Sequence, residues 1–153
     1  MLYLGFKLVH VAGVVLFLGN ITVGVFWKSF ADRNGNFAIK AYTVDAIIKA
    51  DRLFTIPGIV LILIGGIGAA LVGNIPFLST GWLVWGIIAF LLSGMAFGPL
   101  SRVQRQLSTA AHANNSSDYE RLSKGWNLWG TIALALPILA FIFMILKPPL
   151  PAF

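Results

Sequence analysis

The sequence predicts an all-α membrane protein, an antiparallel bundle of four transmembrane helices that forms one domain over residues 1–153. Hydrophobic residues make up 58% of the chain and charged residues only 10%, whereas a soluble domain has about 25% charged residues. The apolar residues also gather in four runs, each near the roughly 20 residues that a helix needs to cross a bilayer. The expected spans are residues 4–27, 53–72, 82–99 and 128–146.

The first run, residues 4–27, is expected to remain in the protein as a helix. It has one flanking charge and no small-residue cleavage site, which argues against a signal peptide. Lys7 lies close enough to its start for the ammonium group to reach the interface. His10 lies about 9 Å into the hydrocarbon at the helical rise of ~1.5 Å per residue. A histidine at that depth needs a partner, so His10 is the first candidate for a site.

A helix is also expected in the connection before the second run, over residues 36–54. This segment follows the turn signal Asn34-Gly35. It places Asp45 four residues before Lys49, an order that stabilises a helix. The second span is therefore expected to begin as a helical extension in the cytoplasm.

Two features mark the start of the second span. Asp51 and Arg52 are expected to form a solvated pair at the interface, with a gate at the inner mouth of the span as the alternative, and Pro57 is expected to kink the helix. No acidic residue lies deep in any of the four runs. A proton or sodium transporter driven by a membrane carboxylate is therefore not expected.

Small residues in the second and third runs are spaced for close helix packing. Glycine-rich "GGIGAA" lies inside a span, with no strand before it, so it is not a phosphate-binding loop. The spacing small-xxx-small instead lets helix backbones approach closely in lipid, within one chain or between two copies. The pairs are Gly65 with Ala69, Gly66 with Ala70, and Gly94 with Gly98.

The fourth run, residues 128–146, follows the polar segment "SSDYERLSKGW". Ser117 stands three residues before Glu120 in this segment, which is the pattern of a capping box. A helix is therefore expected to begin there, in the cytoplasm, and to continue into the span. Pro137 is expected to kink it.

Basic residues orient the protein. Nine of the eleven Lys and Arg residues fall in the connections between spans one and two and between spans three and four: Lys28, Arg33, Lys40, Lys49, Arg52, Arg102, Arg105, Arg121 and Lys124. The positive-inside rule places these connections in the cytoplasm and both termini outside. The expected location is the bacterial inner (plasma) membrane. Topology accounts for the basic residues, so nucleic acid is not an expected partner.

His10 has two interpretations from its chemistry. It forms a hydrogen bond to a carbonyl or hydroxyl group of a neighbouring helix, or it binds haem iron or copper. His112 lies on the opposite side of the membrane and cannot complete a bis-histidine site. Met144 lies at a depth closer to that of His10 and is the better second ligand, ahead of Lys7 and Met1. A five-coordinate iron, without a second protein ligand, stays open as well.

Two resemblances bear on this choice. The segments "HVAGVVLFLGNITVGVFWKSFADRNGN" and "DRLFTIPGIVLILIGGIG" resemble domain of unknown function 2269, a bacterial family of integral-membrane proteins. The first span, in which Lys7-x-x-His10 precedes Phe17, Gly19 and Asn20, is similar to that of HemJ-type protoporphyrinogen oxidases and copper-resistance D-like membrane proteins. The resemblance to the HemJ-type enzymes implies that His10 is an axial ligand of haem.

The expected function is therefore that of a b-type haem protein in electron transfer or porphyrin handling, as a membrane oxidoreductase if it is an enzyme. Two alternatives stay open. One is a carrier of Cu(I) or a small solute, in which His10 acts with Met144 and Met1. The other is an accessory membrane subunit without a cofactor. Expected partners are the lipid bilayer and, through the glycine faces, a second copy or a larger membrane complex.

Overall fold

The computed structural model describes residues 1–152 and is helical throughout its regular structure; Phe153, the last residue of the predicted domain, lies outside the described residues. The helices are α1 (Leu2–Asn34), α2 (Phe37–Ala50), α3 (Ile56–Val72), α4 (Gly81–His112) and α5 (Ser116–Leu146), and a π-helical turn, η1 (Asp51–Thr55), joins α2 to α3. Four units are long and apolar enough to cross a membrane: α1, the continuous helix α2–η1–α3, α4 and α5. The predicted fold class is confirmed.

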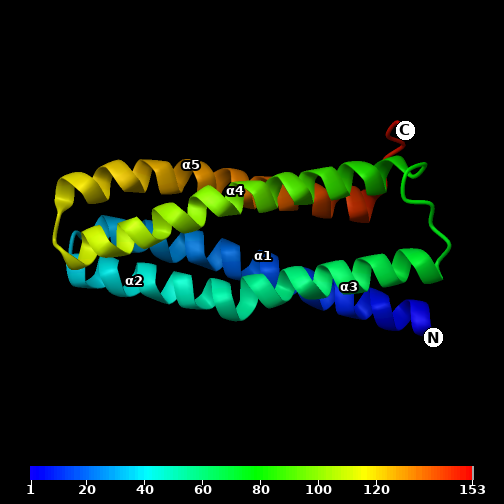
Figure 1. The fold of residues 1–153 in the computed structure, drawn as a ribbon, viewed down its shortest axis with the longest axis horizontal. Coiled ribbons are helices and arrows are strands. Elements are labelled where there is room, and N and C mark those ends of the chain that lie inside the picture. The colour runs from blue at the N-terminus through cyan, green and yellow to red at the C-terminus, as the bar shows by residue number, and fades with distance from the viewer. Residues whose placement is uncertain (153) are drawn as a thin grey trace.

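The four units pack as two antiparallel pairs, α1 with α3 and α4 with α5 (Figure 1). The turns after α1 and α4 lie at one end of the bundle, here called the basic end because it carries nine of the eleven Lys and Arg residues. Both termini lie at the opposite, terminal end. The pairs join through α2 against α4 and through α1 against α5, whereas α3 approaches neither α4 nor α5 in residues 1–152.

The turn between α1 and α2 follows the sequence signal at Asn34-Gly35. Gly35 adopts a left-handed conformation with φ of 76°, which a residue without a Cβ reaches at little cost. Asn36 then caps α2, because its side-chain oxygen accepts a hydrogen bond from the Ala38 N–H at 2.8 Å. The chain thus reverses within two residues.

The start of α5 differs from the expected capping box. Asn115, not Ser117, is the N-cap, and its side-chain oxygen accepts a hydrogen bond from the Asp118 N–H at 3.2 Å. Ser117 already lies in the first turn, where its hydroxyl donates to the same oxygen at 3.0 Å. The pairing of Ser117 with Glu120 was wrong because an asparagine two residues earlier offers an equally good cap.

All four units continue as helices into the basic end, α1 and α4 beyond the predicted spans 4–27 and 82–99. Their extensions bury a shared apolar core, in which Val44, Leu107 and Ala111 are at most 1% exposed. This core gives each extension an apolar face to pack. The basic end is therefore the better-packed half of the molecule.

Candidate functional site

A buried carboxylate lies where η1 meets α1 and α4. Asp51 is only 8% exposed. Its Oδ1 accepts hydrogen bonds from Asn20 Nδ2 at 3.1 Å and Thr55 Oγ1 at 2.9 Å, and its Oδ2 accepts one from Gln104 Nε2 at 3.1 Å. All three donors are neutral, and none of the ion pairs within residues 1–152 includes Asp51. A buried charge is normally paired, so this carboxylate is a candidate binding group.

The contact with Asn20 shows how deep Asp51 lies. Asn20 precedes Trp27 by seven residues, which is about 10 Å along a helix from the end of the first predicted span. The expected solvated pair of Asp51 and Arg52 is wrong, because Arg52 is exposed while Asp51 faces the interior. Adjacent helical residues do not face each other. Asp51 precedes the second predicted run in sequence, yet it lies beside Asn20, which is within the first run.

Pro57 accounts for the π-helical turn that carries Asp51. Proline has no N–H to donate to the carbonyl of Leu53, four residues earlier, so the regular α-helical pattern is interrupted at this point. In η1 the N–H of Ile56 donates instead to the carbonyl of Asp51, five residues earlier. The irregularity expected at Pro57 takes the form of this wider turn, a feature that is frequent at functional sites.

An apolar cavity of about 520 Å³ lies beside Asp51, between α1, α2, α4 and α5. Its size is within the range of small-molecule sites. Asn20, Asp51 and Gln104 all line it, so the polar groups of the Asp51 cluster face the cavity. The rest of the wall is largely apolar and aromatic, and includes Val23, Trp27, Phe30, Ile39, Tyr42 and Phe97. Trp27, Phe30 and Tyr42 are more than half exposed, so the cavity opens on their side.

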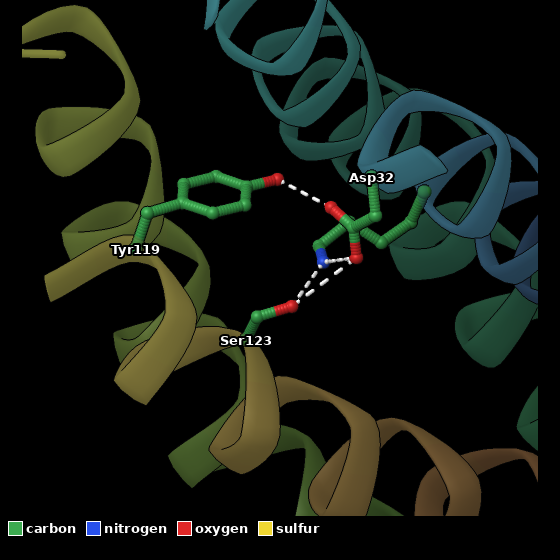
Figure 2. Close-up of polar contacts among 4 residues, drawn as sticks. Asp32, Tyr119 and Ser123 are labelled. Atoms are coloured by element: carbon green, nitrogen blue, oxygen red, sulfur yellow. Dashed lines mark hydrogen bonds and ion pairs between the residues drawn. The ribbon is translucent and has the colours of Figure 1, made fainter. Parts of the chain in front are cut away.

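A second polar cluster joins α1 to α5 near the basic end (Figure 2). Lys28 is fully buried, and its Nζ donates to Asp32 Oδ2 at 2.5 Å and to Ser123 Oγ at 2.7 Å. The rings of Tyr119 and Trp126 lie 5.3 and 5.1 Å from the same nitrogen. Figure 2 shows the Tyr119 hydroxyl pointing at Asp32, to which it donates at 2.7 Å.

These contacts give the Lys28 cluster a structural role. Burial, and then the Asp32 carboxylate, raise the pKa of the Tyr119 phenol, so the hydroxyl remains a donor. Ser123 also donates to Asp32, at 3.2 Å. The Lys28 ammonium is paired with a carboxylate and is therefore not poised to take a proton from Ser123. The cluster holds α1 against α5.

His112 takes part in a third contact, at the surface of the basic end. Its Nε2 lies 2.9 Å from Asp45 Oδ2, and the Ser108 hydroxyl donates to Asp45 Oδ1 at 2.5 Å. The Ser108 hydroxyl and, less strongly, His112 hold the pKa of the Asp45 carboxyl below its usual value. The group ties α2 to α4.

The two predicted haem ligands lie in different helix pairs. His10 Nδ1 is 2.9 Å from the backbone oxygen of Ile62 in α3, and its ring packs against Gly66. Met144, in α5, instead packs against Gly86 of α4. No group of three or more His, Asp or Glu side chains in residues 1–152 is arranged to hold a metal ion.

The small residues predicted to pack helices fall into two groups. Gly65 and Gly66 lie against His10, where α1 and α3 approach each other, and Ala70 is buried in the same helix while Ala69 is half-buried. A Cβ on Gly94 or Gly98 would meet no atom of residues 1–152 within 4 Å. Packing of the Gly94 and Gly98 face against a second copy therefore stays a prediction.

The Asp51 cluster was not predicted as a site from the sequence. Its one local signal is the spacing of Asp51 and Thr55, which puts the two side chains close together on one helix. Asn20 bonds a neighbouring helix, through Asp51 and Thr55. Gln104 carried no signal, because its partner is 53 residues away in the chain.

Comparison with known proteins gives a family without a described chemistry. No curated protein and no solved structure matches this chain. The family described as "Predicted integral membrane protein (DUF2269)" matches residues 4–148. This is nearly the whole chain and includes His10, Asp51 and the cavity. The protein belongs to the DUF2269 family of predicted integral membrane proteins.

Proposed function

We propose that this protein binds a small amphiphile from the membrane in the cavity beside Asp51. The form of the cavity supports this function: about 520 Å³ of largely apolar wall, with Asn20, Asp51 and Gln104 together in one cluster. Ligand sites commonly combine an apolar wall with a few convergent polar groups. A molecule with an apolar body and one polar head matches this arrangement. Trp27, at the end of the first predicted span, borders the opening, so a ligand held at the membrane interface, where amphipathic rings gather, lies beside the entrance.

Filling the cavity tests this proposal. Ala46 lines it and is exposed, so Ala46→Phe places a ring in the opening without a change in the buried core. Dodecylamine and dodecanol are the probes, and native mass spectrometry of the detergent-purified protein counts the bound molecules. We expect one-to-one binding of at least one probe to the wild type and a loss of at least tenfold in affinity in Ala46→Phe.

The matched control is Ala12→Phe, at an exposed alanine of α1 that lines neither described cavity. This variant should bind as the wild type does. Failure of both probes to bind the wild type, or equal binding by Ala46→Phe, would contradict the proposal.

We further propose that the basic end faces the cytoplasm of the bacterial inner membrane and that both termini lie outside. The nine basic residues at that end support this orientation through the positive-inside rule. The chain has no cysteine, so single-cysteine variants give an unambiguous test. In intact cells a membrane-impermeant maleimide should label Ser79→Cys, in the turn before α4, and not Ala113→Cys. The reverse pattern would overturn the orientation.

A second candidate is haem binding by His10, in electron transfer or porphyrin handling. The contact with Ile62 favours it: a backbone carbonyl only accepts, so His10 Nδ1 carries the hydrogen. In this tautomer the lone pair is on Nε2, the arrangement found in many metal-binding histidines. Met144 packs in the other helix pair, so the geometry favours a single protein ligand.

Haem added to the purified protein should give a Soret band that His10→Ala abolishes and His112→Ala leaves unchanged. A colourless wild-type protein, or a band retained in His10→Ala, would exclude this candidate. Metal analysis of the same samples tests the copper alternative, which requires about one equivalent of copper without haem.

A further inference from the structure

We infer that the head of the bound amphiphile is an ammonium group, held by the Asp51 carboxylate and the side-chain carbonyl oxygens of Asn20 and Gln104. This inference rests on the proposed function and specifies its ligand class, a primary amine with an apolar body. Three steps lead to it, from the orientation of the amides, the charge of the cluster and the nature of the cavity wall.

The first step is the orientation of the two amide groups. A carboxylate only accepts hydrogen bonds, so Asn20 and Gln104 must turn their NH₂ groups toward Asp51. Asn20 Nδ2 also donates to Thr55 Oγ1 at 2.8 Å, which fixes its amide a second time. The carbonyl oxygens of both residues therefore point away from these contacts.

Those carbonyl oxygens are available to a ligand. Neither oxygen accepts a hydrogen bond in residues 1–152. Every side-chain oxygen there that is sealed from solvent does have a partner, so these two oxygens are not sealed. Both residues line the cavity. Gln104 is only 4% exposed, so its free oxygen is reached through the cavity and not from the outer surface. The cluster thus presents two unpaired acceptors to the cavity.

The second step is charge. A carboxylate has about four lone-pair positions, and the hydrogen bonds from Asn20, Thr55 and Gln104 use three. No basic side chain pairs with Asp51, and its neighbour Arg52 is exposed. One acceptor position remains, and no basic side chain balances the charge that the carboxylate carries when it is ionised. A head that donates hydrogen bonds and carries positive charge complements both.

The apolar cavity wall favours an organic ammonium over a metal cation. A sodium ion would use the same oxygen atoms but would leave the apolar volume of about 520 Å³ without a purpose. An alkyl or aryl body fills that volume, and the faces of Trp27 and Tyr42 attract organic cations as well. A carboxylate or phosphate head would meet only like charge and acceptors. The arrangement favours an amphiphilic amine.

Ligands that share one alkyl chain and differ in their head groups test this inference. The test uses the wild-type protein, so it does not depend on the folding of a variant. The probes are dodecylamine, dodecanol and dodecanoic acid, with binding measured by native mass spectrometry in one detergent. Hydrogen bonds to a charged partner are stronger than neutral ones, so the amine should bind roughly tenfold to a hundredfold more tightly than the alcohol. The acid should bind most weakly.

Asp51→Asn removes the charge and keeps the shape of the side chain. We expect the ratio of amine to alcohol affinity to fall to near one. Each probe partitions into the detergent equally for the wild type and the variant, so partitioning cancels when their ratios are compared. The matched control is Asp118→Asn at the surface of the basic end, which should leave the ratio unchanged. If Asp51→Asn does not fold, Gln104→Met removes one carbonyl oxygen at similar volume and should lower the ratio several-fold.

The outcomes separate this inference from the function on which it rests. Equal binding of amine and alcohol to the wild type overturns the ammonium site and leaves an amphiphile-binding protein. Binding of neither probe overturns the proposed function itself. Stabilisation by NaCl over choline chloride, without a preference for the amine, identifies an alkali-ion site and also overturns the inference.

Discussion

Gly65→Ala is expected to force α1 and α3 apart and to lower the free energy of unfolding by about 3 kcal/mol, the upper part of the range for overpacking. A Cβ on Gly65 would lie 2.7 Å from the Cα of His10 and 2.8 Å from the backbone oxygen of Phe6. Backbone atoms cannot move aside as the end of a side chain can, so the whole interface must shift. Unfolding in mixed micelles, followed by circular dichroism, measures the change.

The control is Gly98→Ala, a second glycine within a membrane helix. A Cβ there meets nothing within 4 Å, so the substitution should be neutral or slightly stabilising, since alanine is the better helix former. Equal stability of the two variants would mean that α1 does not pack on α3 at this point.

Lys28→Met is expected to have a comparable effect, a loss of about 3 kcal/mol. The substitution keeps most of the volume of the buried side chain but leaves Asp32 without its counter-ion and Ser123 without its donor. Asp32 stays 28% exposed, so solvent limits the cost. The same unfolding measurement applies.

An exposed ion pair provides the comparison. Arg121 and Asp118 are 2.8 Å apart, but their side chains are 72% and 47% exposed. Arg121→Met should change the stability by less than about 0.5 kcal/mol, because solvent screens such pairs. The double variant Lys28→Met with Asp32→Asn should lose less than the sum of the two single variants. Additive losses would show that the two groups do not act as a pair.

Hydrophobic run length was sufficient to predict the fold. In an apolar solvent the runs at 4–27 and 128–146 must form helices, because only a helix satisfies their backbone hydrogen bonds. Each run is about as long as the bilayer is thick, so each is expected to cross the membrane once. Local signals also located the turn at Gly35, because this turn depends on the left-handed backbone conformation of the glycine itself and on no distant residue. The start of a helix was harder to predict where two residues could both serve as the N-cap, as Asn115 and Ser117 can at the start of α5.

The Asp51 cluster could not be predicted in the same way. Asp51 meets Asn20 and Gln104, residues 31 and 53 positions away, and no spacing in the chain links them. Its depth was also misjudged, because the second apolar run begins after it in sequence although Asn20 of the first run lies beside it. The pair of Lys28 and Asp32 has the local spacing of an ion pair, but its burial depends on Tyr119 and Trp126 of α5.

For His10, chemistry alone left two interpretations. The hydrogen bond to Ile62 is of the kind expected from a histidine that joins helices. A metal-binding histidine commonly makes the same bond through its other nitrogen. The haem-binding measurement on the wild type and on His10→Ala separates the two.

The arrangement in two helix pairs has a consequence for biogenesis. Residues 1–72 contain the whole α1–α3 pair, and this hairpin can form in the membrane while the ribosome is still making the second one. Lys28 and Asp32 of the Lys28 cluster, and Asp51, belong to this first hairpin. Their partners Gln104, Tyr119 and Ser123 arrive only with the second. A nascent or truncated chain therefore exposes polar groups that the full-length protein covers, a chemical signature by which membrane quality control can distinguish an unfinished molecule from a complete one.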